Sequence, residues 1–125
     1  MQADLSDDTG TSGIKSLTRL FRALGDGTRL RIVALLSHGE LCVCHLEKAL
    51  GLSQPNVSRQ LGVLRMAGVV DARRHGTWVY YALAPQQQEA VQTVLSTLAR
   101  TFGAARATRI DHAKLRRSCG PDACK

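Results

Sequence analysis

The stretch that decides the fold runs from Val43 to Ala67 and reads VCHLEKALGLSQPNVSRQLGVLRMA. Many helices end with a glycine at the C′ position, and Gly51 is a candidate for this role. It predicts a first helix over residues 43–50. Ser53 is a candidate N-cap for a second helix, and Pro55 is tolerated in the first turn of that helix. Two helices joined by about three residues that include a glycine have the spacing of a helix-turn-helix. The predicted buried face of the second helix comprises Val57, Leu61 and Leu64.

The chain before this pair predicts two more helices. Apolar side chains recur at i, i+3, i+4 and i+7 from Leu17 to Leu24, which is the stripe of an amphipathic helix, and Gly25 ends it. Asp26 is a candidate N-cap for a helix over residues 28–36. That helix is apolar over most of its circumference, so we expect it at the centre of the molecule. Residues 1–13 have almost no apolar content and are expected to form a disordered leader.

The chain after the pair changes to residues typical of β-strands. Two runs, residues 69–74 and 77–81, flank His75-Gly76. We interpret this dipeptide as a two-residue hairpin turn, because its glycine accepts a positive φ. Pro85 then breaks the pattern, and a last amphipathic helix follows it.

The predicted elements form a mainly α domain over residues 14–102, a winged helix-turn-helix with one β-hairpin wing. Its first helix, residues 14–24, and its last helix, residues 87–102, are amphipathic and lie outside the helix-turn-helix. A small module often buries such stripes against a second copy, so these helices predict the interface of a two-fold homodimer. The alternative is that they pack on their own core. Residues 103–125 form a basic tail that contains two of the four cysteines.

The charge of the chain favours a polyanionic partner. Its 125 residues carry 17 Lys and Arg against 10 Asp and Glu, a net charge of +7, and nucleic acid is the commonest partner of a small basic domain. No apolar run is long enough to span a membrane, and the acidic N-terminus is the reverse of a signal peptide, so a cytoplasmic location is expected. No glycine-rich phosphate loop and no nucleophile–base signature occurs, so neither an enzyme nor a catalytic cofactor is expected.

The second helix of the pair presents a polar face opposite its buried one. Arg59 lies about 200° from Val57 around a helix and therefore points outward. Arginine pairs with guanine, glutamine and asparagine pair with adenine, and serine serves a base or a phosphate, so this face suits a reader of the major groove. The wing would follow the DNA backbone or minor groove and add salt-dependent affinity. The alternative is an ordinary solvated helix face and hairpin. The candidate DNA-binding residues are Ser53, Gln54, Asn56, Ser58, Arg59 and Gln60 on the helix and Arg73, Arg74 and His75 on the wing.

Four segments of the chain resemble one protein family. They are LGDGTRLRI at residues 24–32, ELCVCHL at 40–46, SQPNVSRQL at 53–61 and GTWVYY at 76–81. In this order they resemble the ArsR/SmtB family of metal-responsive repressors, and within it the arsenic branch. The resemblance extends over most of the predicted domain. It implies a homodimeric repressor that binds inverted-repeat operator DNA when it is ligand-free.

The resemblance assigns inducer binding to Cys42 and Cys44. Their thiolates would bind trivalent arsenic or antimony, which take three sulfurs, and the DNA would then be released; cadmium and lead are alternative inducers. On an ideal helix, residues i and i+2 lie about 200° apart, so binding by both sulfurs is expected to distort the first turn of the helix. A third alternative is a thiol redox regulator, in which the cysteines cycle through disulfides or sulfenic acid.

The chain departs from the family pattern around this pair. The family often has a third cysteine one turn later, where this chain has Glu47, and commonly an Asp after the pair, where it has His45. A third thiolate would come from Cys119 or Cys124, from the other subunit, or be absent. The family's second inducer site, for zinc-like ions, lies between the last helices and has no matching ligands in this chain. The corresponding residues are Pro85, Gln87, Leu98 and Thr101.

Overall fold

The fold is a winged helix-turn-helix, as the sequence predicts. The computed structural model describes residues 11–104, so residues 1–10 and 105–125 lie outside the described range. Within that range the elements alternate between helices and short strands. In chain order they are α1 (Thr11–Leu24), α2 (Gly27–Leu36), β1 (Leu41–Cys42), α3 (Val43–Leu50), α4 (Gln54–Met66), β2 (Val70–His75), β3 (Trp78–Leu83) and α5 (Glu89–Ala104).

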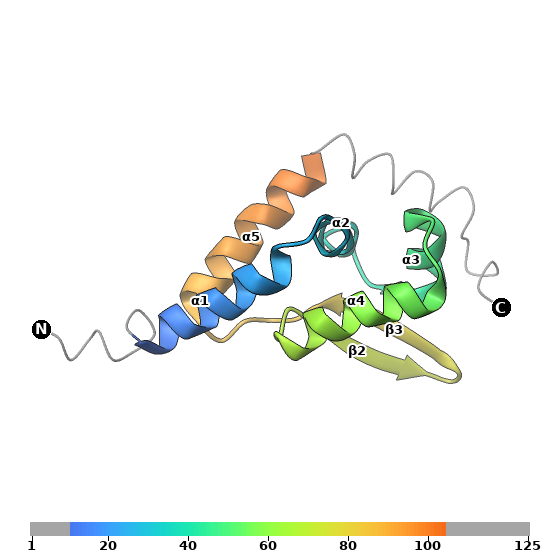
Figure 1. Cartoon of the computed structure of the whole chain (residues 1–125), viewed down its shortest axis with the longest axis horizontal. Coiled ribbons are helices and arrows are strands. Elements are labelled where there is room, and N and C mark those ends of the chain that lie inside the picture. Colours follow the sequence, from blue (N-terminus) through green and yellow to red (C-terminus); the bar gives the residue numbers. More distant parts are fainter. Residues whose placement is uncertain (1–10, 105–125) are drawn as a thin grey trace, which may run out of the picture.

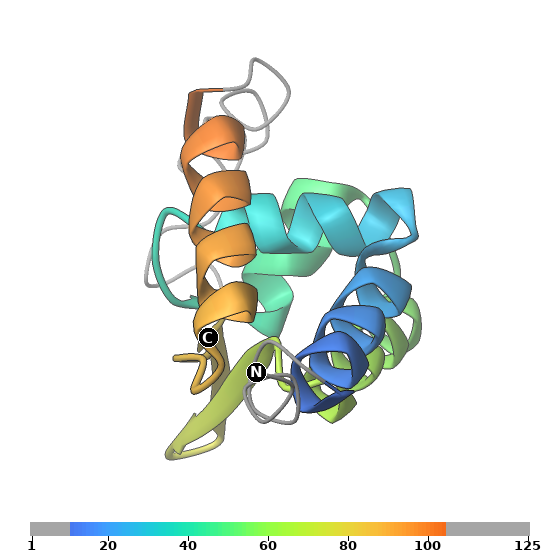
Figure 2. The ribbon, with the colours of Figure 1, turned by 90° about the vertical axis from the view of Figure 1, so that its left-hand side faces the viewer.

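Helix α2 lies at the centre, and helices α1, α4 and α5 pack against it (Figure 1). Helices α1 and α5 contact each other at one end of the molecule, while α3 and α4 lie toward the other end (Figures 1 and 2). The central position of α2 follows from its apolar circumference, since Ile32, Val33 and Leu35 are each 0% exposed. Each such burial stabilises the fold by about 1.5–3 kcal/mol relative to an exposed side chain.

The helix-turn-helix forms as predicted because its glycine and its apolar positions coincide with the helix geometry. Gly51 ends α3 in the left-handed region at φ 70°, and its N–H donates to the carbonyl oxygen of Glu47 at 2.8 Å. On α4, the three predicted inward residues are all 0% exposed. This buried face fixes the rotation of α4, and therefore fixes which of its polar residues face outward.

The sheet contains a strand that the sequence analysis missed. Its order is β1-β3-β2, and β1 adds a third strand to the predicted hairpin. Leu41 pairs with Tyr81 and Cys42 with Tyr80, in antiparallel register. A strand this short shows no alternation of apolar and polar residues, and its pairing partner lies far away in the chain. The first cysteine of the pair therefore belongs to the sheet of the wing.

The turn at the end of the wing lies one position later than predicted. His75 pairs with Trp78 as the last rung of the β2–β3 hairpin, so the two loop residues are Gly76 and Thr77. Gly76 has φ 63°. Two-residue hairpin turns need a positive φ at their first loop position, and glycine adopts it without steric cost. The register follows the glycine, and His75 belongs to the strand.

The N-terminal ends of the helices differ in detail from the sequence prediction. Helix α1 begins at Thr11 rather than at Ile14, inside the predicted leader. Asp26 caps α2 as predicted, because its side chain accepts a hydrogen bond from the backbone N–H of Thr28 at 2.9 Å. Ser53 occupies the N-cap position of α4 but its side chain makes no cap bond. Pro55 removes one of the two backbone donors that such a cap normally uses. Among the described helices, none is both long and apolar enough to cross a membrane.

Candidate DNA interface and cysteine pair

The outward face of α4 carries a set of polar side chains that are already ordered by contacts among themselves. The amide nitrogen of Gln54 donates to the hydroxyl oxygen of Ser58 at 2.7 Å. Arg59 is exposed, and its guanidinium donates to the side-chain oxygen of Asn56 at 3.4 Å. Because neighbouring turns of one helix hold these groups, their donors and acceptors are displayed on one side of α4. Such a face suits hydrogen bonding to base edges.

Gln60 belongs to a different environment from the other polar residues of α4. Its side-chain oxygen accepts a hydrogen bond from Arg29 of α2 at 2.9 Å. Arg29 also donates to the carbonyl oxygen of Ala23 at 2.6 Å and lies 3.3 Å from a carboxylate oxygen of Asp26. These contacts connect α4 to the end of α1 and the start of α2. The structure therefore gives the side-chain oxygen of Gln60 a partner inside the protein.

Arg73, a predicted DNA-binding residue of the wing, is bound by the protein itself. Its guanidinium donates two hydrogen bonds to the Glu40 carboxylate, at 2.8 and 2.6 Å, and lies 5.0 Å from the centroid of the Tyr80 ring. The hydrogen bond from Arg73 lowers the pKa of Glu40, and the same bond raises the pKa of Arg73, so both groups stay charged. Arg74 and His75, farther along β2, are exposed.

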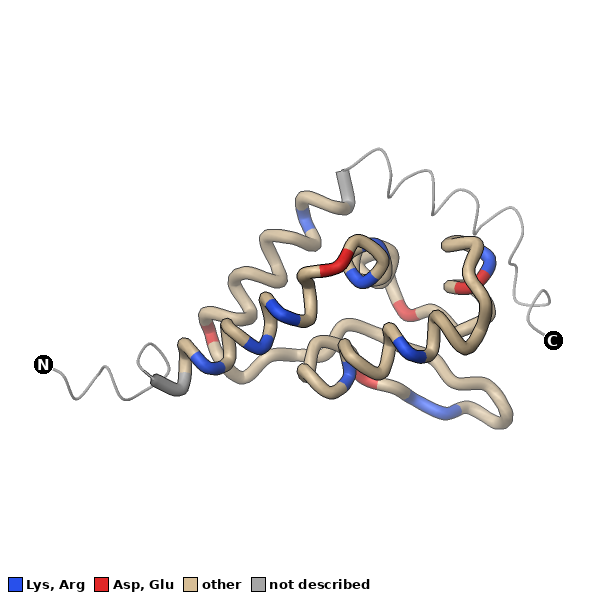
Figure 3. The backbone as a smooth tube through the Cα atoms, viewed as in Figure 1, with Lys and Arg blue, Asp and Glu red and all other residues tan. Residues whose placement is uncertain are grey.

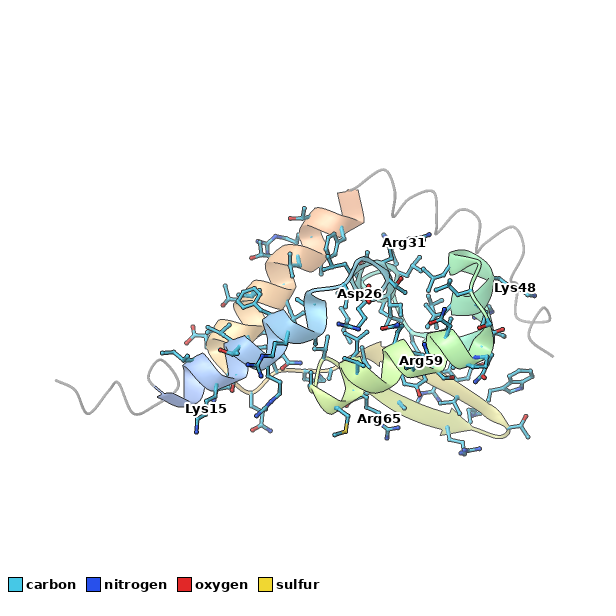
Figure 4. All side chains as sticks on the ribbon, in the orientation of Figure 1. Lys15, Asp26, Arg31, Lys48, Arg59 and Arg65 are labelled. Atoms are coloured by element: carbon cyan, nitrogen blue, oxygen red, sulfur yellow. The ribbon has the colours of Figure 1, made fainter. Side chains whose placement is uncertain are left out.

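Several basic residues of the described chain lie along one side of the molecule. Figure 3 shows the Lys and Arg positions of α1, α4 and β2 along its lower edge. In Figure 4 the side chains of Lys15 and Arg65 lie along that edge and Arg59 lies over the middle of α4, whereas Arg31 lies at the top beside α2 and Lys48 lies at the far end beside α3. Cations that share a face with the polar surface of α4 favour an approaching phosphate backbone.

The two cysteines of the pair lie side by side, which corrects the expectation from an ideal helix. Cys42 ends β1 and is the N-cap of α3, with an extended backbone at φ −86° and ψ 165°. Cys44 lies in the first helical turn, and the two sulfur atoms are 3.1 Å apart. The separation of about 200° applies only when both residues are helical. A tetrahedral ion with metal–sulfur bonds of about 2.3 Å needs sulfurs roughly 3.8 Å apart, so the pair has to open only slightly.

His45 is a member of this cluster that the sequence analysis did not assign to the site. Its Nδ1 lies 3.3 Å from the sulfur of Cys42. The signal in the sequence was its position directly after the pair. Cys42 is 2% exposed, while Cys44 and His45 are half-buried. Over residues 11–104 no group of three or more His, Cys, Asp or Glu side chains is arranged to hold a metal ion. Cys119 and Cys124 lie outside the described residues.

Comparisons with known proteins agree with this architecture. A family model described as "Bacterial regulatory protein, arsR family" matches residues 26–72. The arsenic resistance transcriptional regulator ArsR1 of Pseudomonas putida is 49% identical over 77 residues, which cover 61% of this chain and 60% of that protein. The arsenical resistance operon repressor of Escherichia coli is 45% identical over 98 residues, which cover 66% of this chain and 84% of that protein. A homodimeric winged helix-turn-helix DNA-binding domain from Mycobacterium bovis is a structural neighbour at TM-score 0.59 and 31% identity, covering 71% of this chain and 82% of that chain.

The fold and the outward face of α4 define a winged-helix DNA-binding regulator. The match to the family model begins at the N-cap of α2 and ends inside β2, so it includes the whole helix-turn-helix. The chain belongs to the arsR family of bacterial regulatory proteins, which are transcriptional regulators and not enzymes.

Proposed function

We propose that this protein is a homodimeric repressor that binds inverted-repeat operator DNA when ligand-free and is released by trivalent arsenic or antimony at Cys42 and Cys44. The observation that carries the proposal is the pair of sulfur atoms 3.1 Å apart at the start of the helix-turn-helix. Two relatives named for arsenic resistance support the choice of inducer.

The DNA-binding part of the proposal rests on the outward face of α4. Gln54, Asn56, Ser58 and Arg59 would meet base edges in the major groove, with Ser53 beside them at the start of the helix. Arg74 and His75 would follow the DNA backbone from the exposed end of the wing. Two such surfaces in a two-fold dimer read two half-sites, which gives the operator its inverted symmetry.

The inducer-binding part rests on the chemistry of the donors. Trivalent arsenic takes three sulfur ligands, and thiolates select such soft ions. Cys42 and Cys44 would supply two of them, and we propose that Cys119 or Cys124, of the same or the other subunit, supplies the third. The thiolate is the form of a cysteine that binds such an ion.

The position of the pair offers a route from inducer binding to DNA release. Cys42 ends a strand of the wing sheet and begins α3, which packs on α4. A change in the separation of the sulfurs therefore acts on the two elements that would hold DNA. An inducer shifts the population away from the DNA-binding geometry only by its differential affinity for the two states.

The test is a fluorescence-anisotropy titration of the reduced full-length protein on DNA from its own promoter, with arsenite and cadmium added separately. Arsenite should release the wild-type protein from the DNA. The Cys44→Ser protein should bind DNA as the wild type does and resist release. Cys44 is the better target because it is only half-buried, whereas Cys42 is 2% exposed. The Cys119→Ser and Cys124→Ser proteins identify the third sulfur.

Three outcomes contradict the proposal. Loss of DNA binding in Cys44→Ser would give the cysteine a structural role instead. Release of the wild type by peroxide, with no effect of either metal, would establish the thiol redox regulator. If arsenite released the Cys44→Ser protein from DNA, the two cysteines would not form the inducer site.

A divalent soft cation is the second candidate inducer, because His45 Nδ1 lies 3.3 Å from the Cys42 sulfur. Imidazole suits zinc-like ions, and cadmium and lead accept mixed donor sets more readily than arsenic does. Release by cadmium alone, weakened in a His45→Asn protein, would favour this candidate. Release by arsenite that is indifferent to His45→Asn would exclude the imidazole from the site.

A further inference from the structure

We propose that the ion pair between Glu40 and Arg73, placed against Tyr80, transmits the state of the cysteine pair to the wing. The inference rests on the proposed function and assigns Glu40 and Arg73 as positioning residues, which act on DNA through the wing. The wing would then respond to the inducer alongside the recognition helix.

The first support is the register of the sheet. Cys42 on β1 pairs with Tyr80 on β3, and Tyr80 pairs with Arg73 on β2. These three residues form one row across the three strands. Cys42, which would bind the inducer, is thus separated by only one strand, β3, from β2. Strand β2 carries Arg73, Arg74 and His75.

The second support is the side-chain link that runs beside this row. Glu40 precedes Cys42 by two residues, and both of its carboxylate oxygens accept from the Arg73 guanidinium, at 2.8 and 2.6 Å. The same guanidinium lies 5.0 Å from the Tyr80 ring centroid, within cation–π range. Residues 40–42 are therefore attached to the wing twice, by backbone pairing and by a fork-like charge pair.

The strength of the Glu40–Arg73 ion pair is limited because solvent reaches both side chains. The side chains of Arg73 and Glu40 are 54% and 35% exposed, and an ion pair that solvent screens to this degree changes an equilibrium constant by about two- to fivefold. Such a pair is too weak to hold the fold alone. The pair is strong enough to change the position of the wing. A small shift of residues 40–42 breaks it at a small cost in free energy.

The experiment measures the release factor, which is the dissociation constant for operator DNA with arsenite divided by the constant without it. Anisotropy at one fixed salt concentration gives this ratio for the wild type, Glu40→Gln, Arg73→Gln and the double variant. Each single variant should lower the release factor by about two- to fivefold, and the double variant should lower it no further, because both changes remove the same contact.

Asp71→Asn is the matched control. Asp71 is an exposed acid on the same strand, β2, and its replacement changes the net charge as Glu40→Gln does. Either change tightens DNA binding through charge alone, with and without arsenite, so this effect cancels in the ratio. The release factor of Asp71→Asn should equal that of the wild type.

A second readout does not depend on DNA release. Thiolate–arsenic absorbance gives the affinity for arsenite with and without saturating operator DNA. Coupling between two ligands is reciprocal, so the ratio of these affinities should change in Glu40→Gln by the same factor as the release factor.

The outcomes separate this link from the proposed function. A wild type that arsenite does not release overturns both. A wild type that is released, together with an unchanged release factor in Glu40→Gln, overturns the link alone. Additive effects of Glu40→Gln and Arg73→Gln overturn it as well, since independent roles add.

Discussion

Cys42 combines two structural positions in one residue. Its backbone is extended, which lets it pair with Tyr80 in the sheet, and it is also the N-cap of α3. The extended backbone turns its side chain toward the sulfur of Cys44, 3.1 Å away, instead of to the far side of a helix. One ψ angle of 165° at Cys42 therefore brings together two sulfur atoms that an ideal helix would hold on different sides.

Arg59→Ala should weaken specific operator binding by about 1–3 kcal/mol and relax the sequence preference. Arg59 is exposed on α4, opposite the buried face, and donates a long hydrogen bond of 3.4 Å to the side-chain oxygen of Asn56. The measurement is anisotropy on operator DNA and on a scrambled duplex at equal salt.

Arg100→Ala is the control for Arg59→Ala. Arg100 is exposed on α5, so its replacement removes the same charge from outside the helix-turn-helix. This protein should keep the ratio of specific to non-specific affinity. An Arg59→Ala protein that keeps the same ratio would show that Arg59 contacts no base.

The helix-turn-helix contains one glycine in its turn and one inside α4, and the two affect the stability of these elements in opposite directions. Gly51→Ala should destabilise the fold by about 1–2 kcal/mol, because φ 70° is unfavourable for a residue with a Cβ. Gly62→Ala should stabilise it by about 0.5–1 kcal/mol, because Gly62 lies inside α4 and an added Cβ meets nothing within 4 Å. Urea denaturation at one protein concentration measures both changes. Shifts of the same sign would contradict the role of backbone conformation at Gly51.

Local patterns explain which elements could be predicted from the sequence. The helical repeat of Val57, Leu61 and Leu64 and the glycine after α3 are short-range signals, so α3 and the rotation of α4 were predicted correctly. Strand β1 was missed because its two residues form a strand only by pairing with β3, which is distant in the chain.

The candidate site shows the same division. Its two cysteines could be read from the sequence, but their sulfur–sulfur distance depends on the backbone angles of one residue. The contact of Glu40 with Arg73 joins residues 33 positions apart, and no local pattern contains it. The hairpin turn was placed one residue early because Gly76 fits either turn position by conformation alone, and only the strand register distinguishes them.

At the scale of the whole molecule, α1 leaves large apolar side chains uncovered. Ile14 is 63% exposed and Phe21 is 55% exposed, although α1 packs against α5 and also contributes Leu20 to the core at 2% exposure. On α5, Val94, Leu98 and Phe102 pack only partly against that core. Both helices were predicted to form a homodimer interface, and uncovered apolar surface of this kind supports that prediction.

Phe21→Glu should therefore dissociate the proposed homodimer. In a two-fold interface the change occurs twice, and each lost phenylalanine contact costs about 1.5–3 kcal/mol, so the dimer dissociation constant should rise at least a hundredfold. The monomer should stay folded, because Phe21 is already more than half exposed in it. Thr77→Glu is the control: Thr77 is exposed in the loop of the wing hairpin, outside the predicted interface, and its variant should remain dimeric. Sedimentation equilibrium measures both proteins, and a Phe21→Glu protein that sediments as the wild type does would exclude this face of α1 from the interface. In the proposed function one protomer would read one half-site, so dissociation should also remove most of the operator affinity while the far-ultraviolet spectrum is retained.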